Sequence, residues 1–367
     1  MKKIFVLLIL ALVVAFSACS SEPEVEIYEP TAPVDVETPE PETPEPIETT
    51  EEPEIIEDEE EYPTYEPATQ GSNIHGAIHR VEYGGNVAYL FGTIHGGHAH
   101  WFPLADVVED ALRRADVVAV EVAEIAMGSD TFDDSIMEAM FLPDGLTWVD
   151  ILPEDEYRHL VETLRGWGLV YEHTNTMNPA FLISILELQF LLSISEFNID
   201  WDVTVDVYIT AVATELGLPV IGLESIEQQI DIVYNPPFEV MLARIMSFLS
   251  PNELLEMLYD SDELTLDEMA FYYENNNFEP INRSFAQTLG ADVECLYAIY
   301  MREIASNWRS TYYANEIMRL LQETEEPTTF FVAVGLSHIN RSEAGEEFTD
   351  IVQQMRLAGF NVMPIWE

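Results

Sequence analysis

The sequence predicts an α/β domain with a mostly parallel or mixed central sheet, helices on both faces of that sheet, and a helical insertion in the middle. Three short apolar runs, at 117–122, 219–223 and 328–334, predict strands, and the first has the composition of a strand buried on both faces. Segments with apolar residues at helical spacing lie between these runs. Strands that alternate with helices are typical of the α/β class.

The domain begins with a predicted hairpin. Residues 77–83 alternate between apolar and polar side chains, Gly84 and Gly85 supply a turn, and 87–91 form an apolar run. A helix is expected over 103–115, with Pro103 in its first turn. The buried strand at 117–122 follows this helix directly.

The middle of the domain is predicted to be largely helical, over 153–198, 203–216 and 238–300. Residues 179–195 are very apolar, but Glu187 interrupts them, so a buried helix is favoured over a membrane span. Gly217 is suited to end the second helix. The strand at 219–223 then interrupts the helical region.

The C-terminal part returns to alternating elements. Residues 302–322 predict one long helix or two, and the strand at 328–334 follows. A helix is expected over 343–357, ended by Gly359, and the last strand over 360–365.

The N-terminus has the pattern of an exported lipoprotein. Lys2 and Lys3 precede an uncharged apolar run at 4–16, which is shorter than the roughly 20 residues that span a bilayer. This run fits a signal peptide over 1–18, and Phe-Ser-Ala-Cys at 16–19 resembles a lipobox with Cys19 as the lipidated residue. We therefore expect the protein at the cell membrane, facing outside the cytoplasm and held through the lipid anchor only.

The composition separates a tether from the domain. Residues 19–70 consist of the lipidated cysteine and a Glu-, Pro- and Thr-rich stretch that predicts a disordered tether, and 71–367 form the α/β domain. The chain has a formal net charge of −54, and Lys2 and Lys3 are its only lysines. Nucleic-acid binding needs clustered positive charge, so this class of partner is excluded.

One short motif occurs twice, each time after an apolar strand. Gly92 precedes His95 by three residues, and Gly335 precedes His338 by the same spacing. In open α/β sheets, ligands bind beyond the carboxyl ends of the strands. The two imidazoles could share a divalent metal there, with zinc, manganese or cobalt as candidates. Each motif alone is weak, because a histidine after a strand is often purely structural.

The ordered set of motifs resembles the TraB/PrgY/GumN family, whose animal relatives are the TIKI proteases. The matching pieces are Tyr-Leu-Phe-Gly-Thr-Ile-His at 89–95, Ala-Asp-Val-Val-Ala-Val-Glu at 115–121, Pro-Val-Ile-Gly-Leu-Glu at 219–224 and Val-Gly-Leu-Ser-His at 334–338. The resemblance covers residues 76–365, which is nearly the whole domain.

The resemblance implies a site with two histidines, an acidic residue and an arginine. Carried over by position, these are His95 and His338 as metal ligands, and Glu121 as a third ligand or as the base that activates water. Arg309 fits the family's arginine best, with Arg302 as a rival. Ser310 and Tyr313 replace the residues usual after that arginine, and Thr204 replaces the glycine of a Gly-x-Asp pattern that ends at Asp206.

Several site residues also have ordinary structural explanations. Glu121 could pair with Arg113 or Arg114 at the strand end. Glu224 could support the ligands or could cap the helix that follows it. His98 and His100 could assist the same metal or could lie on a solvated loop.

The resemblance implies a metal-dependent hydrolase, with Glu121 and Arg309 in catalytic roles and a peptide as substrate. Family members include pheromone-shutdown proteins, which suggests peptide signals as one substrate class. The alternative is a non-catalytic surface protein that binds or sequesters a peptide signal. An association with polysaccharide assembly rests on the name GumN alone.

Overall fold

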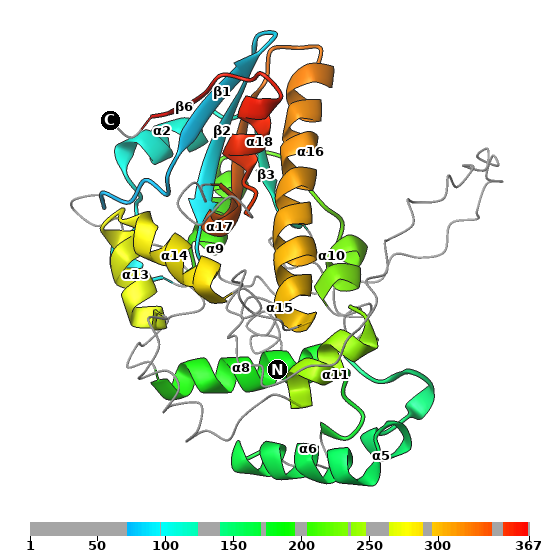
Figure 1. Ribbon diagram of the computed structural model, residues 1–367. Coiled ribbons are helices and arrows are strands. Elements are labelled where there is room, and N and C mark those ends of the chain that lie inside the picture. The colour runs from blue at the N-terminus through cyan, green and yellow to red at the C-terminus, as the bar shows by residue number, and fades with distance from the viewer. Residues whose placement is uncertain are drawn as a thin grey trace, which may run out of the picture. The chain divides into compact units, whose positions relative to one another are not determined.

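A six-stranded mixed sheet forms the centre of the fold in the described residues (Figure 1). The computed structural model describes residues 72–95, 97–123, 140–169, 174–194, 204–233, 236–246, 264–288, 296–339 and 348–365, all within one unit. The strands are β1 (His79–Tyr83), β2 (Asn86–Thr93), β3 (Val117–Val120), β4 (Val220–Gly222), β5 (Thr329–Gly335) and β6 (Val362–Pro364). Their order across the sheet is β4-β3-β5-β2-β1-β6.

The sheet is parallel on one side and antiparallel on the other. β2 pairs with β5, β5 with β3 and β3 with β4 in parallel, whereas β1 pairs antiparallel with β2 and β6. Gly84 and Gly85 form the turn between β1 and β2, both with positive φ. The predicted α/β class with a mixed sheet and an N-terminal hairpin is therefore confirmed.

The register aligns the ends of the four parallel strands. Thr93 at the end of β2 lies opposite Gly335 at the end of β5. Val120 at the end of β3 lies opposite Ala333 of β5 and Gly222 of β4. The carboxyl ends of β2, β3, β4 and β5 therefore meet at one edge of the sheet, where ligands bind in open α/β folds.

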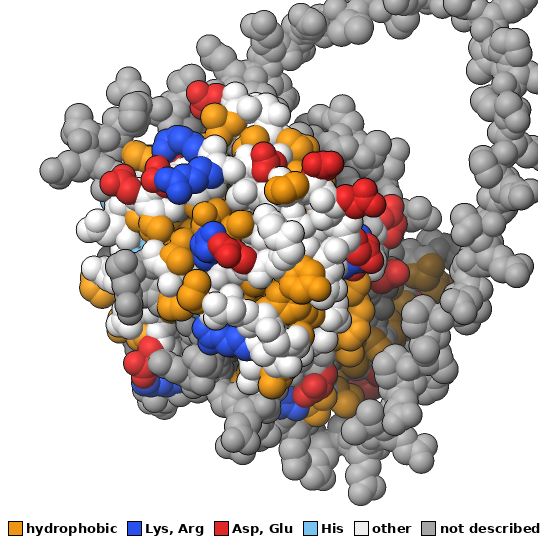
Figure 2. All heavy atoms as spheres, turned by 90° about the horizontal axis from the view of Figure 1, so that it is seen from above, with side chains coloured by type: hydrophobic (Ala, Val, Ile, Leu, Met, Phe, Trp, Pro, Cys, Tyr) orange, Lys and Arg blue, Asp and Glu red, His pale blue; other side chains and the backbone are white. Residues whose placement is uncertain are grey.

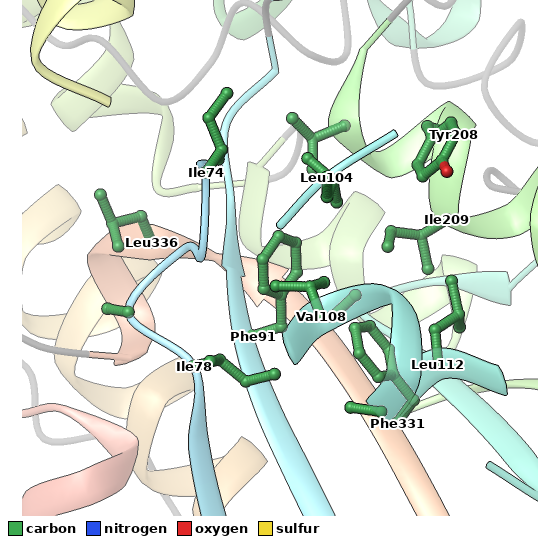
Figure 3. Packing of buried hydrophobic residues seen from close by; sticks show 14 of the residues in the cluster. Ile74, Ile78, Phe91, Leu104, Val108, Leu112, Tyr208, Ile209, Phe331 and Leu336 are labelled. Atoms are coloured by element: carbon green, nitrogen blue, oxygen red, sulfur yellow. The ribbon is translucent and has the colours of Figure 1, made fainter. Parts of the chain in front are cut away.

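Helices cover both faces of the sheet, as predicted. On one face, Phe91 and Phe331 point into an apolar cluster, with their ring centroids 5.7 Å apart (Figure 3). On the other face, Leu90 and Val332, their neighbours in sequence, belong to a second cluster. The first cluster includes side chains from α2 (Asp106–Arg113), α9 (Val205–Glu215), α13 (Leu266–Glu274) and α14 (Phe278–Thr288), and the second from α16 (Arg309–Glu323) and α18 (Ile351–Leu357).

The helical insertion has an apolar cluster of its own. Most of its members lie on α5 (Trp148–Ile151), α6 (Glu154–Gly166), α8 (Pro179–Ile194), α11 (Phe238–Met246) and α15 (Leu296–Tyr300). Val122, Ile226 and Phe348 join the cluster from outside these helices. α11 packs against α6, α8 and α15. Within the described part of the chain, no helix combines the length and the apolar character that crossing a bilayer requires.

The remaining short elements connect these layers. They are η2 (Ala99–Trp101), η3 (Pro143–Gly145), α10 (Ile226–Val233) and α17 (Leu336–Ile339). The segment predicted as one long helix or two, 302–322, consists of a π-helical stretch, η4 (Met301–Trp308), followed directly by α16. α15, which lies in the preceding predicted helical region, leads directly into η4. π-helical segments are rare and often occur at functional sites.

Some element boundaries differ from those the sequence predicts. The first strand begins at His79 rather than at residue 77, because Ala77 has a positive φ of 49° that an extended strand does not allow. Pro103 precedes the helix that begins at Asp106, since Ala105 is its N-cap. The last helix begins at Ile351, where the side chain of Asp350 accepts the N–H of Gln353 as a cap.

Many surface arginines are paired within a single helix. Arg114 contacts Asp110, Arg158 contacts Glu154, and Arg319 contacts Glu316. Figure 2 shows the same mixture on the face seen from above, where arginine and acidic side chains lie side by side among apolar ones. Exposed pairs of this kind add little to stability, typically about 0.2–1 kcal/mol each.

Candidate functional site

The aligned strand ends position four of the predicted site residues. Glu121 follows β3 directly, and Glu224 lies two residues after the end of β4. His95 lies two residues after the end of β2, and His338 lies in α17, which continues from β5. Parallel strands bring these positions to one edge although they are far apart in the sequence.

Arg309 joins the two glutamates from the first residue of α16. Its Nη2 donates to Oε2 of Glu121 over 2.8 Å and to Oε1 of Glu224 over 2.6 Å. Arg309 is buried, and the charge-assisted contacts of its guanidinium are the kind that make such burial tolerable. The rival Arg302 instead donates to its sequence neighbour Glu303 over 2.8 Å.

Glu121 accepts hydrogen bonds on both carboxylate oxygens. The N–H of Gly335 donates to Oε1 over 2.7 Å, while Arg309 occupies Oε2. A Cβ at Gly335 would lie 3.3 Å from Oε1, so glycine permits this close approach. Arg113 and Arg114, the structural partners considered from sequence, pair with Glu109 and Asp110 on their own helix.

The pKa of Glu121 reflects these contacts. Burial raises the pKa of this carboxyl, but the positive charge of Arg309 and the imidazoles of His338 and His95 outweigh burial and lower the pKa to about 2. Glu121 is therefore ionised at any physiological pH. Both histidines are close enough to affect its titration.

Glu224 is more deeply buried than Glu121. Burial raises its pKa, and the charge of Arg309 opposes only part of this effect. The alternative role of Glu224 as a helix cap does not hold. Ser225 caps α10 instead, because its hydroxyl accepts from the N–H of Gln228 and its own N–H donates to the Gln228 side chain.

Tyr313 belongs to the site, although sequence reasoning treated it only as a departure from the family pattern. Its hydroxyl donates to Oε1 of Glu224 over 2.8 Å and also contacts Arg309. Its ring and the imidazole of His338 form a T-shaped pair, with centroids 5.2 Å apart. The available signal was its spacing of one helical turn from Arg309.

His95 is held by a carboxylate that sequence reasoning did not assign to the site. Its Nδ1 lies 3.0 Å from Oδ2 of Asp206, and the hydroxyl of Thr93 donates to Oδ1 of the same carboxylate over 2.7 Å. Burial lowers the pKa of His95, but the charge of Asp206, its hydrogen bond and the charge of Glu121 together outweigh burial, and the pKa lies above its usual value. Asp206 is in the first turn of α9, just after its N-cap Thr204.

His338 has a different partner. It is buried, and its Nδ1 lies 2.8 Å from the hydroxyl oxygen of Ser310. That hydroxyl also donates to the backbone carbonyl of Ser306 over 2.8 Å. Ser310 follows Arg309, so one turn of α16 contacts both Glu121 and His338.

The other two candidate histidines contact a different part of the fold. The rings of His98 and His100 stack with centroids 5.0 Å apart, and Nε2 of His100 lies 3.2 Å from Oε1 of Glu274 on α13. Glu274 also accepts from the indole N–H of Trp101. These contacts indicate that His98 and His100 belong to a loop held against α13 and not to the site at the strand ends.

The side chains at the strand ends offer two imidazoles to a metal, but the third donor is engaged. Among the described residues, no group of three or more histidine, cysteine, aspartate or glutamate side chains is arranged to hold a metal ion. Glu121 explains part of this result, because its two oxygens contact Gly335 and Arg309. A metal bound by His95 and His338 would need its remaining ligands from water or substrate. Cys19, the expected lipidation site, lies outside the described residues.

Comparisons with known proteins agree with the ordered motifs. The model of the TraB/PrgY/gumN family matches residues 77–364, which is most of the chain. No curated protein and no solved structure matches.

Proposed function

Because the chain belongs to the TraB/PrgY/gumN family, we propose that it is a lipid-anchored, metal-dependent hydrolase that faces outside the cytoplasm and cleaves peptides. The observation that carries this proposal is the convergence of an arginine, a carboxylate and two imidazoles at the strand ends. Arg309 contacts Glu121 directly, and both His95 and His338 lower the pKa of that glutamate.

His95 and His338 are the residues that would hold the metal. Imidazole nitrogen suits zinc, manganese and cobalt alike, so the identity of the metal remains open in the proposal. When bound, such an ion would make a water molecule acidic enough to supply hydroxide at neutral pH. The acidity of the surrounding chain favours accumulation of cations near the site.

Glu121 and Arg309 would act together on the substrate. Glu121 holds the guanidinium in place through the 2.8 Å contact, and the Gly335 N–H fixes the carboxylate itself. Arg309 would then stabilise negative charge that develops on the carbonyl oxygen of the substrate, or would bind a substrate carboxylate. This geometry favours Glu121 as a fixed charge over Glu121 as a mobile base.

The experiment is metal analysis combined with a peptide-hydrolysis panel on the purified full-length protein. His95→Ala and His338→Ala are expected to lose bound metal and hydrolysis, while the folded state persists. His159→Ala, which changes an exposed histidine on α6, should alter neither property. Glu121→Gln should keep more metal than either histidine variant yet lose turnover, because Arg309 loses one of its two carboxylate partners.

A non-catalytic protein that sequesters a peptide is the second candidate. The observation that favours it is the absence, among the described residues, of a group of three or more metal-binding side chains. Full-length protein that binds peptides tightly, carries no metal and hydrolyses none of the panel would establish this candidate and overturn the first.

A further inference from the structure

The imidazole of His338 contacts the Ser310 hydroxyl, which has a second hydrogen-bond partner. Ser310 is fully buried, and its hydroxyl lies 2.8 Å from the Ser306 carbonyl and 2.8 Å from Nδ1 of His338. A hydroxyl has one proton to donate, but its oxygen can also accept. Both contacts are satisfied together only when Ser310 donates to the carbonyl and Nδ1 of His338 carries the proton that Ser310 accepts.

The position of the proton on the imidazole of His95 is determined even more directly. An ionised carboxylate has no proton to donate, so the 3.0 Å contact with Asp206 requires a proton on Nδ1 of His95. The Thr93 hydroxyl occupies the other oxygen of Asp206 and keeps the carboxylate in this orientation. In a neutral ring with a proton on Nδ1, the lone pair lies on Nε2.

We propose that Ser310 and Asp206 are positioning residues that hold the imidazoles of His338 and His95 in the same tautomer, with Nδ1 protonated. The two partners are chemically different, a buried hydroxyl and a carboxylate, yet they impose the same proton position. Each ring thereby directs its lone pair through Nε2. What that lone pair binds rests on the proposed function, because a metal is the ligand that would use it there.

Packing around His338 supports a fixed ring. The rings of Tyr313 and His338 form a T-shaped pair at an interplanar angle of 77°, and the Tyr313 hydroxyl donates to Glu224 over 2.8 Å. A Cβ at Gly335 would lie 3.7 Å from Cδ2 of the same ring. Because packing already fixes the ring on these sides, the contact with Ser310 determines which nitrogen carries the proton rather than where the ring lies.

The chain contains a matched control for Ser310. Ser184 is also fully buried in a helix, and its hydroxyl donates to the Ala180 carbonyl four residues earlier over 2.9 Å. Ser310 makes the same kind of contact to Ser306, also four residues earlier. Removing either hydroxyl costs a similar helix contact, but only Ser310 contacts a histidine of the site.

The test is long-range proton–nitrogen NMR on the metal-free full-length protein with ¹⁵N-labelled histidine, at a pH where the rings are neutral. The spectra of His95→Ala and His338→Ala identify the two signals. In the unchanged chain both rings should carry the proton on Nδ1. Ser310→Ala should lower the ratio of the two tautomers of His338 about fivefold, which is the effect of losing one neutral hydrogen bond, and should leave His95 unchanged.

The controls give the result its meaning. Ser184→Ala should leave both signals unchanged, whereas Asp206→Ala should shift the tautomer of His95 but not that of His338. Asp206 is partly exposed, so this second variant tests the inference even if Ser310→Ala fails to fold. With Zn²⁺ alone as the probe, Ser310→Ala should weaken binding about tenfold, as is common when the partner of a ligand is removed.

Two outcomes would overturn the inference: a proton on Nε2 of His338 in the unchanged chain, or a tautomer ratio that Ser310→Ala does not alter. The tautomer measurement needs neither metal nor hydrolysis, so it separates this inference from the proposed function. Tautomers that respond as expected, in a protein that binds no metal, would support Ser310 and Asp206 as positioning residues and contradict the metal-dependent hydrolase.

Discussion

At the residue scale, two glutamates contact the same arginine, but their pKa values are shifted in opposite directions. Glu121 accepts from the Gly335 N–H and from Arg309 and faces two imidazoles, and its pKa falls to about 2. Glu224 is buried with fewer positive neighbours, and burial raises its pKa. Arg309 and the Tyr313 hydroxyl therefore lie between a carboxylate that stays ionised and one that is closer to protonation.

The Tyr313 hydroxyl should stabilise the fold more than a comparable buried hydroxyl elsewhere. It contacts the charged groups Arg309 and Glu224, whereas the hydroxyl of fully buried Tyr273 donates over 2.7 Å to the neutral carbonyl of Gly92. Hydrogen bonds to charged groups contribute about 1.5–3 kcal/mol, and neutral ones about 0.5–1.5 kcal/mol. Tyr313→Phe should therefore lower the free energy of unfolding by more than Tyr273→Phe does, measured by urea denaturation. Equal losses would show that the site charges do not depend on this hydroxyl.

At the element scale, a buried ion pair joins the apolar helix α8 to α11 within the insertion. Glu187 of α8 contacts Arg244 of α11 over 3.0 Å, and neither side chain is appreciably exposed. Arg244 also lies over the ring of Tyr297 on α15, 5.3 Å from its centroid. In the sequence, the charge of Glu187 favours a buried helix over a membrane span. The structure shows that Arg244 is the partner that permits the burial of this charge.

This ion pair should make the stability of the protein depend on pH. Burial raises the pKa of Glu187 to about 6, and Arg244 only partly opposes that shift. The folded protein therefore holds this proton at a pH where the unfolded chain, with its ordinary value of 4.5, has released it. The sign follows from linkage: the free energy of unfolding falls as pH rises from 4.5 towards 6, by on the order of 2 kcal/mol from this group.

Urea denaturation across that pH range measures the effect. Glu187→Gln cannot release a proton, so the fall in the free energy of unfolding with rising pH should become smaller. Glu154→Gln is the matched control, because Glu154 pairs with Arg158 on the surface, where its side chain is 92% exposed. A slope that is the same in Glu187→Gln and the unchanged chain would contradict the raised pKa.

At the scale of the whole molecule, the predicted lipid anchor would hold the domain at the membrane. Cys19 ends the lipobox-like segment, and the described part of the chain holds no helix suited to span a bilayer. Cys19→Ala is therefore expected to release the protein from the membrane or to leave its precursor uncleaved. Membrane fractionation with detergent partitioning measures both results. A variant that still partitions with the membrane at its mature size would show that the lipoprotein prediction is wrong.

The sequence by itself determined the α/β class, the hairpin, the strands, the two Gly-x-x-His motifs and the family. These features are local, since they depend on the spacing of residues a few positions apart. The helical middle was also predictable, although Gly168 with a φ of +74° divides its first segment after α6. Boundaries shifted wherever a cap or a positive φ decided them, as at Asp350 and Ala77.

Only the tertiary structure decided which side chains meet. Gly335 and Glu121 are 214 positions apart, His95 and Asp206 are 111 apart, and Arg309 and Glu224 are 85 apart. Asp206 ends a Gly-x-Asp-like pattern and Ser310 follows Arg309, but neither pattern tells which side chain the residue contacts. Their roles arise because parallel strands end at one edge of the sheet and α16 packs across it, and such contacts depend on the packing of the whole chain.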